Sequence, residues 1–408
     1  MTLTVTVHRG TAQIGGTCIE IVHPAGQRLV LDAGRPLDAP DGKTGLLPDS
    51  LDLSGLATVL ICHSHQDHWG LINDLPRAWP VWTGEASAKL IGITSRLARA
   101  PLSRELNCWS SRGSFTIGEF RVTPILTDHS AFDAYMLLIE GAGQRVLYSG
   151  DFRRHGRKSV LVDRLMNSPA EPVDLLILEG TNLGTDKPVV AESALEIEFQ
   201  SLFNRTDGRV FCCWSGQNID RTVTLYRAAL RTGRTLVIDL YTAEVLEAIS
   251  GGTRLPRPGM DNLKVVITRG LAKHYRDCGR EDFVARMAAV GISARAIENS
   301  RYVVMLRDGL MHDYVARGVT PIQKDAFVWS MWRGYLDKPS KAVDWCRTSG
   351  AEVCHIHTSG HASPADLRAF AASVGARQVI PVHGTNWDTQ AVGFTGIVRV
   401  ADGEPLHV

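Results

Sequence analysis

The sequence predicts an α/β protein in which one domain is inserted into another. Residues 1–180 alternate short β-type runs with turns, and helical periodicity there is clearest over residues 85–99. From about residue 190, strands and helices alternate as they do in βα units. Side chains able to bind a metal lie on both sides of this middle block. We therefore expect the chain to leave one domain near residue 182, build a second, and return near residue 353.

Period-two patterning and β-branched residues indicate the individual strands. In the first part we expect strands over residues 3–8, 17–22, 28–31, 58–62, 121–126, 135–139, 145–148 and 175–178. In the middle block we expect helices over 194–204, 219–231, 243–249 and 281–290, and strands over 209–213, 236–240 and 264–268. The last part is predicted to run from a strand at 353–357 through a helix at 364–374 to a strand at 378–381.

Composition indicates a globular protein. The 408 residues are 44% hydrophobic and 21% charged, and their formal net charge is +1. This balance argues against a highly basic nucleic-acid coat protein, although an enzyme needs only one local basic groove. No apolar run reaches the roughly 18 residues needed to cross a bilayer. The chain starts with a strand pattern and not a signal peptide, so we expect no membrane association and a cytoplasmic location. Its cysteines form no CxxC pair, so we expect reduced thiols.

The densest chemical pattern follows the apolar run at residues 58–62. Three histidines and an aspartate occur within the next six residues, at His63, His65, Asp67 and His68. In extended backbone His63 and His65 project the same way, and the other two come from the following turn. Three imidazoles and a carboxylate suit zinc or a similar divalent ion. A polar loop with fortuitous histidines would crowd imidazoles together with no ion to organise them.

Three other predicted strands end in potential ligands, at His129, Asp151 and His383. Each of these alone is equally well read as a turn or capping residue. Loops at the C-terminal ends of strands are, however, where such folds usually place function. Together with the first cluster, these residues are enough for two ions if Asp151 bridges them.

The segment 63–68 meets in full the HxHxDH signature of the metallo-β-lactamase superfamily, which the sequence resembles. The resemblance implies an αββα sandwich with two metal ions. One ion would be held by His63, His65 and His129, and the other by Asp67, His68 and His383, with Asp151 between them. Asp32 matches the family's early strand-end aspartate, which is usually structural.

Three positions resemble motifs A, B and C of the β-CASP nucleases, a branch of this superfamily: Glu179, His361 and His383. The segment 215–221 resembles the loop and helix start that open their inserted domain. The resemblance implies a metallo-β-lactamase domain over residues 1–182 and 353–408, with an inserted β-CASP α/β domain over residues 183–352. A histidine at motif C goes with RNA substrates in this branch, and the whole pattern is most similar to ribonuclease J-like nucleases.

Roles follow from this resemblance and from side-chain chemistry. Asp67 would ligate a metal and orient the attacking hydroxide, and His361 would stabilise the scissile phosphate or protonate the leaving oxygen. Glu179 would orient His361. The candidate substrate-binding residues are Ser215, Gln217 and Asn218 at a predicted helix start, Ser359 and Gly360, and Arg153 and Arg154. A basic run is as often plain solvated surface, and an aromatic such as Trp329 or Trp332 is more often packing.

We therefore expect a phosphodiesterase that uses two divalent metal ions to hydrolyse single-stranded RNA in RNA processing or decay. Zinc is the expected metal and manganese the alternative. A DNA-directed nuclease and a small-substrate hydrolase of the same fold are the rival functions, and a homo-oligomer stays open. Residues 327–334 do not match the Gly-rich segment with which ribonuclease J holds a 5′-monophosphate, so we expect weak discrimination between 5′ ends.

Overall fold

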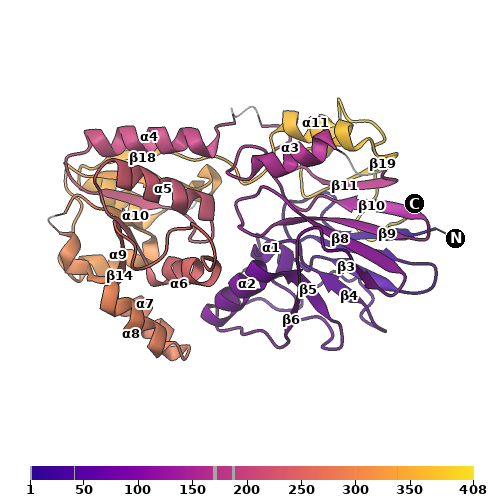
Figure 1. Ribbon diagram of the computed structural model, residues 1–408, viewed down its shortest axis with the longest axis horizontal. Coiled ribbons are helices and arrows are strands. Elements are labelled where there is room, and N and C mark those ends of the chain that lie inside the picture. Colours follow the sequence, from indigo (N-terminus) through magenta and orange to yellow (C-terminus); the bar gives the residue numbers. More distant parts are fainter. Residues whose placement is uncertain (1, 41, 169–171, 186–188, 299, 338) are drawn as a thin grey trace. The chain divides into compact units, whose positions relative to one another are not determined.

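The computed structural model describes the chain except residues 1, 41, 169–171, 186–188, 299 and 338. The chain forms two compact units, each with its own sheets and helices (Figure 1). The first unit consists of Met1–Gly92, Leu102–Val189 and Gly360–Val408, and the second of Ile93–Pro101 and Val190–Ser359. Apart from the short segment over residues 93–101, the chain thus leaves the first unit after residue 189 and re-enters it at residue 360.

Two sheets build the first unit. A 7-stranded sheet has the order β20-β1-β2-β3-β4-β5-β6, and a 6-stranded sheet has the order β19-β11-β10-β9-β8-β7. The strands of the first sheet are β20 (Pro405–His407), β1 (Thr4–Arg9), β2 (Cys18–Val22), β3 (Arg28–Leu31), β4 (Thr58–Leu60), β5 (Val81–Gly84) and β6 (Leu106–Trp109). Those of the second are β19 (Gln378–Val382), β11 (Leu175–Glu179), β10 (Gln144–Tyr148), β9 (Tyr135–Gly141), β8 (Phe120–Leu126) and β7 (Phe115–Ile117).

Three apolar clusters hold this unit together. The largest lies between the sheets and joins residues such as Leu60 of β4 to Ile177 of β11. A second cluster packs α3 (Ser159–Asn167) and α11 (Pro364–Val374) against the second sheet, where Figure 1 shows both helices together. A third covers the outer face of the first sheet with α1 (Gln66–Trp69), α2 (Glu85–Leu97) and the segment around Trp79. Helix, sheet, sheet and helix therefore form four layers, and the predicted αββα sandwich is confirmed.

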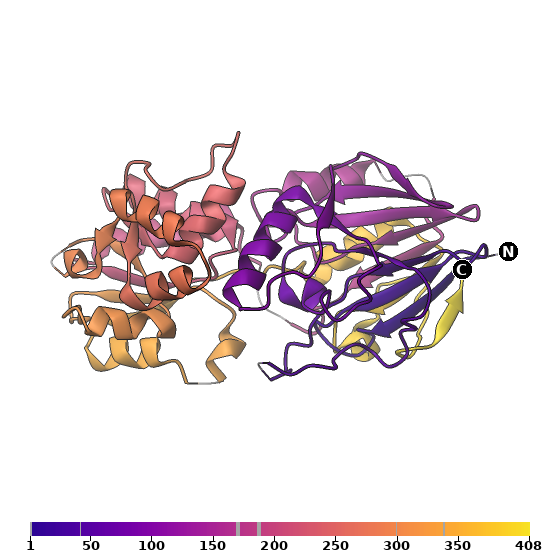
Figure 2. The ribbon, with the colours of Figure 1, turned by 90° about the horizontal axis from the view of Figure 1, so that it is seen from below.

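The ends of the chain meet in the first sheet. β1 pairs with β2 on one side and with β20 on the other, so that Thr4 lies opposite His407. Figures 1 and 2 accordingly show the N- and C-termini side by side. The short helix α12 (Trp387–Gln390) precedes β20 and packs Trp387 into the cluster beneath α11.

The second unit is built on a 7-stranded sheet with the order β15-β14-β13-β16-β12-β17-β18, in which neighbouring strands are parallel. Its strands are β12 (Val210–Cys213), β13 (Leu236–Ile238), β14 (Leu263–Ile267), β15 (Ile292–Ser293), β16 (Val303–Met305), β17 (Ala326–Trp329) and β18 (Glu352–His355). Its helices are α4 (Glu192–Arg205), α5 (Ile219–Arg231), α6 (Leu240–Ile249), α7 (Arg269–Asp277), α8 (Glu281–Val290), α9 (Asp308–Val315) and α10 (Lys341–Thr348), with 3₁₀ turns η1 (Ala294–Ile297) and η2 (Arg333–Asp337). The inserted α/β domain predicted from the sequence is therefore present.

Helix starts in the second unit follow local capping chemistry. Asn218 caps α5 by accepting a hydrogen bond from Arg221 N, and Asp239 caps α6 by accepting one from Thr242 N. The predicted helix at 219–231 coincides with α5. The strand that we placed in the return segment, β18, pairs with β17 in this sheet. Throughout the described part of the chain, no helix has the length and apolarity that a membrane span requires.

A buried ion pair ties three segments of the second unit together. Arg221 of α5 and Glu192 of α4 are both fully buried. Arg221 Nε donates to Glu192 Oε1 at 2.8 Å and Nη2 to Oε2 at 3.3 Å, and Nη1 also donates to Ser330 O at 3.1 Å. Removing one partner would leave a buried charge without compensation.

Arg221→Met should therefore destabilise the protein strongly. Methionine keeps most of the side-chain volume but removes the guanidinium that donates to both carboxylate oxygens of the buried Glu192, which costs about 3–5 kcal/mol. Urea unfolding followed by circular dichroism measures the loss. Lys273→Ala, which breaks the solvent-exposed pair with Asp277, is the control and should leave the midpoint unchanged. Equal midpoints for both variants would contradict the structural role of Arg221.

Candidate metal centre

The first group of candidate ligands follows β4. The strand ends at Leu60, the chain turns through His63 and His65, and α1 begins at Gln66. Trp69 Nε1 donates to Ser64 O at 2.8 Å and closes this turn. The turn therefore presents its polar side chains from a rigid frame.

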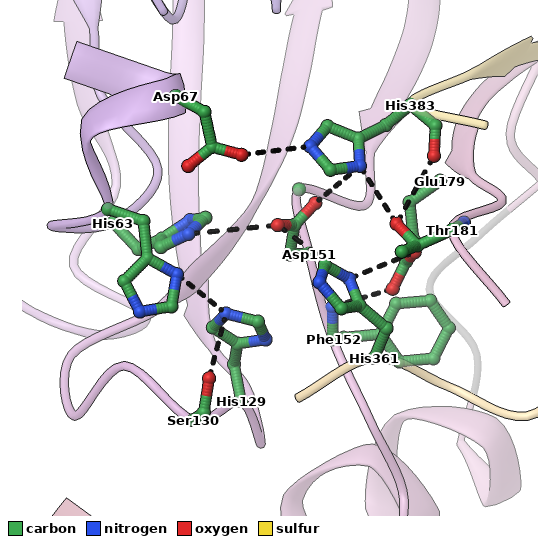
Figure 3. A network of polar contacts seen from close by, with 12 residues as sticks. His63, Asp67, His129, Ser130, Asp151, Phe152, Glu179, Thr181, His361 and His383 are labelled. Carbon is green, nitrogen blue, oxygen red and sulfur yellow. Dashed lines mark hydrogen bonds and ion pairs between the residues drawn. The ribbon is translucent and has the colours of Figure 1, made fainter. Parts of the chain in front are cut away.

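The remaining candidates reach the same place through strand register. β10, β11 and β19 are parallel neighbours, with Tyr148 opposite Ile177 and Glu179 opposite Val382. Their carboxyl ends therefore lie at one edge of the sheet, so that Asp151, Glu179 and His383 come together. His129 follows β8 in the same sheet, and its side chain lies with those of the other strand ends (Figure 3).

Asp151 lies at the centre of the cluster (Figure 3). Its Oδ2 lies 3.1 Å from His68 Nε2, 3.7 Å from His63 Nε2 and 3.8 Å from His361 Nδ1. Its Oδ1 lies 3.7 Å from His383 Nδ1. Apart from the contact with His68, these distances are too long for hydrogen bonds, so the groups surround a shared space.

Three histidines form one side of this space. His63, His65 and His129 each offer a ring nitrogen, and these nitrogens lie within 4.8 Å of one another. Burial lowers the pKa of all three, and for His63 the neighbouring histidines lower it further. The rings are therefore neutral at physiological pH, which is the form that binds a metal.

The second group contains Asp67, His68 and His383, whose candidate ligand atoms also lie within 4.8 Å of one another. His383 Nε2 is 3.4 Å and His68 Nε2 is 3.8 Å from Asp67 Oδ2. Burial alone would raise the pKa of the Asp67 and Asp151 carboxyls, but the surrounding histidines outweigh it and hold both pKa values below the ordinary range. Both carboxylates are therefore ionised.

The donor set fits divalent metal ions. Within the described residues, His63 Nε2 and Asp151 Oδ1 are buried and have no hydrogen-bond partner. Buried polar atoms are normally satisfied, and an orphaned set around one space calls for an explanation. Neutral imidazoles together with carboxylates are ligands that zinc prefers. A metal at this position would satisfy these atoms.

A buried network behind the cluster fixes His68. Asp32 accepts hydrogen bonds from Cys62 N at 2.8 Å and from Tyr148 Oη at 2.6 Å, and it contacts His68 Nδ1 at 2.8 Å and Cys62 Sγ at 3.0 Å. His68 Nε2 is thereby turned toward Asp67 and Asp151. Burial by itself lowers the pKa of His68, but Asp151, Cys62 and Asp32 outweigh it and raise the pKa well above its usual value. Asp32 supports the cluster from behind and is not part of it.

His361 stands where the chain re-enters the first unit. Ser363 caps α11 by accepting a hydrogen bond from Asp366 N, and Pro364 occupies the first turn, so the helix start fixes the residues just before it. His361 Nδ1 lies 3.3 Å from Glu179 Oε2. Burial would lower the pKa of His361, but Glu179 and Asp151 outweigh it and raise the pKa to about 9. The ring is therefore protonated at neutral pH.

Glu179 is itself held in place. Its Oε1 accepts from Phe152 N at 3.2 Å and its Oε2 from Thr181 N at 3.1 Å. Asn182 Nδ2 donates to His361 O at 2.9 Å, so the segment after β11 also holds the backbone of the His361 loop. The predicted pairing of Glu179 with His361 is thus present in the geometry.

The expected substrate-binding residues are placed differently from one another. Gly360 lies beside a candidate ligand, because a Cβ there would come within 2.6 Å of Ser130 Oγ and 3.3 Å of His129 Cε1. Ser215 is exposed before α5, Asn218 caps that helix, and Gln217 is buried and donates to Thr94 Oγ1 and Tyr241 Oη, each at 2.7 Å. Ser359 is the last residue of the second unit.

The two arginines after Asp151 do not extend into solvent as free cations. Arg153 is fully buried, with Nε 3.5 Å from Asp128 Oδ1 and its backbone N donating to Asp128 O at 2.6 Å. Arg154 Nε lies 2.5 Å from Asp163 Oδ1. The expectation that the Arg153 side chain contacts substrate is therefore corrected: its charge stabilises the loop that carries Asp151.

Three supporting residues were not predicted from the sequence: Cys62, Tyr148 and Thr181. Tyr148 and Cys62 end strands that were predicted, but only the register between the strands shows that they share Asp32. Thr181 Oγ1 lies 2.8 Å from His383 Nδ1, although the two residues are far apart in the chain. A hydroxyl two residues after Glu179 is the only signal that the sequence offers for it.

Comparison with known proteins gives the same picture. Residues 27–206 match the model of the beta-lactamase superfamily domain, and residues 350–392 match that of the Zn-dependent metallo-hydrolase RNA specificity domain. A curated relative named ribonuclease J, from Helicobacter pylori (strain B128), is 24% identical over 413 residues that cover 92% of this chain and 55% of the relative. Another ribonuclease J, from Mycobacterium tuberculosis (strain CDC 1551 / Oshkosh), is 24% identical over 414 residues that cover 94% of this chain and 69% of the relative.

The chain spans about half the length of the Helicobacter relative. A solved structure of a protein of unknown function from Enterococcus faecalis V583 superposes with a TM-score of 0.78 and 18% sequence identity, and the match covers 100% of both chains. This similarity extends the shared fold over both units. The chain therefore carries a beta-lactamase superfamily domain and an RNA specificity domain, and over most of its length it is similar to proteins named ribonuclease J.

Proposed function

We propose that this protein is a metal-dependent phosphodiesterase that hydrolyses single-stranded RNA. The observation that carries the proposal is the buried cluster around Asp151, in which imidazole nitrogens and ionised carboxylates from separate strand ends face one space. The RNA specificity domain and the relatives named ribonuclease J support RNA as the substrate.

Two divalent ions, zinc in the first instance, would be held by the residues that the sequence indicated. One ion would bind His63, His65 and His129, and the other Asp67, His68 and His383, with Asp151 between the two. Divalent ions in such a site supply the Lewis acidity that phosphodiester hydrolysis needs at neutral pH.

The chain's own groups would do the rest of the chemistry. His361 carries a proton at neutral pH, and its Nδ1 faces Glu179 Oε2 at 3.3 Å. Its Nε2 is then the atom from which a proton can pass to the leaving oxygen, or with which charge on the scissile phosphate can be stabilised. Glu179 fixes the ring orientation, and the ionised Asp67 would orient the nucleophile. Ser215 and the N-terminus of α5 stay the proposed contacts to the RNA backbone.

Cleavage assays on defined substrates test this proposal. Metal-loaded protein is incubated with end-labelled single-stranded RNA and with DNA of the same sequence, and the products are resolved as a ladder. Cleavage of RNA in preference to DNA is expected. Preferential cleavage of DNA would establish the DNA-directed alternative, and hydrolysis of a small thioester or β-lactam without cleavage of either polymer would establish the other.

Purified protein should contain close to two divalent ions per chain, with zinc predominant. The reason is that the candidate ligands form two groups, one with His63 and one with His68, and that Asp151 Oδ2 lies 3.7 Å from His63 Nε2 and 3.1 Å from His68 Nε2. Elemental analysis after mild dialysis measures the content. A protein that retains no metal, and in which neither zinc nor manganese restores hydrolysis, would overturn the proposed function.

Asp67→Ala and His361→Ala should have different signatures. Asp67→Ala removes a proposed ligand and should abolish both hydrolysis and full metal content. His361→Ala should reduce kcat by about 10²-fold or more while metal content stays close to that of the parent protein, as for loss of a general acid. The solvent-exposed His312→Ala is the control for histidine loss. His361 lies close enough to Asp151 to be a ligand, so loss of metal from His361→Ala would show that it binds the ion instead.

The initial rates of hydrolysis of RNA with a 5′-phosphate and of RNA with a 5′-hydroxyl should agree within about tenfold. A tenfold ratio corresponds to about 1.4 kcal/mol in the activation free energy. In the segment that would have to hold the phosphate, Trp329 is buried, and the backbone N–H and the hydroxyl of Ser330 already donate hydrogen bonds within the protein. Ser330 N donates to Cys213 O at 2.8 Å, and Ser330 Oγ donates to Ile356 O at 2.7 Å. Initial rates on two otherwise identical oligomers measure the ratio, and a larger preference for the phosphate would mean that another pocket binds it.

A further inference from the structure

The hydroxyl of Thr181 makes two contacts with one residue. Thr181 Oγ1 lies 2.8 Å from His383 Nδ1 and 3.2 Å from the backbone oxygen of His383. Thr181 follows β11 and His383 follows β19, and these strands are parallel neighbours with Glu179 opposite Val382. The strand register therefore sets the hydroxyl against the histidine, as Figure 3 shows.

The segments approach closely because glycines line both of them. A Cβ on Gly180 would come within 2.2 Å of Trp387 Nε1, and one on Gly384 within 2.7 Å of Gly180 O. A side chain at Gly384 would thus press on the backbone before Thr181, and one at Gly180 would displace the Trp387 ring. Gly180 N also donates to His383 O at 3.3 Å, which ties the two segments directly.

His383 itself adopts a backbone conformation that a non-glycine residue rarely takes, with φ of 50°. Its N donates to Gly10 O at 2.8 Å, which helps to hold this conformation. Such conformations persist where the surroundings enforce them, and they gather at functional sites. The ring of His383 is thus aimed by the backbone, and the contact with Thr181 decides which nitrogen carries the proton.

Hydrogen-bond accounting gives the direction of that contact. A threonine hydroxyl has one proton to donate and lone pairs to accept. A backbone carbonyl only accepts, so in the contact with His383 O the hydroxyl of Thr181 donates its proton. The contact at 2.8 Å can then be a hydrogen bond only if His383 Nδ1–H donates to Thr181 Oγ1. In a neutral ring this leaves a lone pair on Nε2, which lies 3.4 Å from Asp67 Oδ2. A metal ion held by both atoms would take the place of the N–H that Nε2 would otherwise donate to this carboxylate.

We infer that Thr181 is a positioning residue, which fixes the Nδ1–H tautomer of His383 and presents its Nε2 to a metal shared with Asp67 and His68. The inference rests on the proposed function, because it assigns an orienting partner to one of the proposed ligands. Histidines that bind metals ordinarily donate their other ring N–H to such a partner, and loss of the partner weakens metal affinity about 10–100-fold.

Three variants of the full chain test this inference. Thr181→Val keeps the shape of the side chain but removes the hydroxyl, and Thr181→Ser keeps the hydroxyl. Thr185→Val is the matched control, because Thr185 Oγ1 donates only to the backbone oxygen of Asn182 in the same loop and touches no histidine in the described structure. Zinc affinity is measured by competition with a chromophoric chelator, and the absorption spectrum of the cobalt-substituted protein reports the ligand geometry.

Thr181→Val should bind its weaker zinc ion at least about tenfold less tightly than the parent protein and should show an altered cobalt spectrum. Thr181→Ser and Thr185→Val should match the parent in both measurements. Equal affinity of Thr181→Val and the parent would overturn the inference, and so would a Thr181→Ser variant as weak as Thr181→Val. If the parent protein binds no zinc or cobalt at all, the proposed function itself fails, which is a distinguishable result. Urea unfolding of each variant shows whether a loss of affinity reflects a loss of fold.

Discussion

The buried carboxylate of Asp151 is the group on which the candidate site depends. A charge removed from water is tolerated only when other groups compensate it, and here the compensation comes from His63, His68, His361 and His383. These histidines come from three different chain segments, so the charge can be compensated only when both sheets of the first unit are assembled. The parallel register of β10, β11 and β19 therefore determines the site as much as the side chains do.

Three histidines of the cluster each have an oxygen atom in contact with Nδ1. Asp32 contacts the Nδ1 of His68, Glu179 contacts the Nδ1 of His361, and the hydroxyl of Thr181 contacts the Nδ1 of His383. In each case an oxygen in contact with Nδ1 helps to fix the orientation of the ring. The oxygen also affects the charge: a carboxylate beside His68 or His361 raises its pKa, whereas the neutral hydroxyl of Thr181 brings no charge. Orientation and protonation are thus set separately for each ring.

The sequence predicted what local pattern determines. Residues 63–68 sit directly after a strand, and a strand end is recognisable from the apolar run before it. His361, by contrast, was found only through resemblance, because nothing in residues 357–363 distinguishes a catalytic histidine from a helix-capping neighbourhood. The second unit's elements were also predictable, since βα alternation shows itself in the change of period from two to 3.6.

What escaped prediction depends on tertiary packing. Arg153 lies in a basic run, and only the fold-back of its loop onto Asp128 shows that it is buried. The pairing of Thr181 with His383 depends on the register of β11 and β19. This register cannot be predicted from the residues of either strand alone. β18 is exposed over Glu352 and Val353, so its own residues could not show whether it joins the sheet of the first unit or that of the second.

The near-balance of charge in the sequence has a structural counterpart that bears on how an RNA chain would be held. Arg209 is buried against Asp325, Arg221 against Glu192, and Arg154 lies beside Asp163. These three arginines form ion pairs with carboxylates of the protein, so they add little positive potential that could attract a phosphate backbone. Under the proposed function, these three arginines would therefore contribute little to RNA affinity, whereas the bound ions would contribute directly. Binding and catalysis would then depend on the same metals, and the buried imidazoles around Asp151 would serve both.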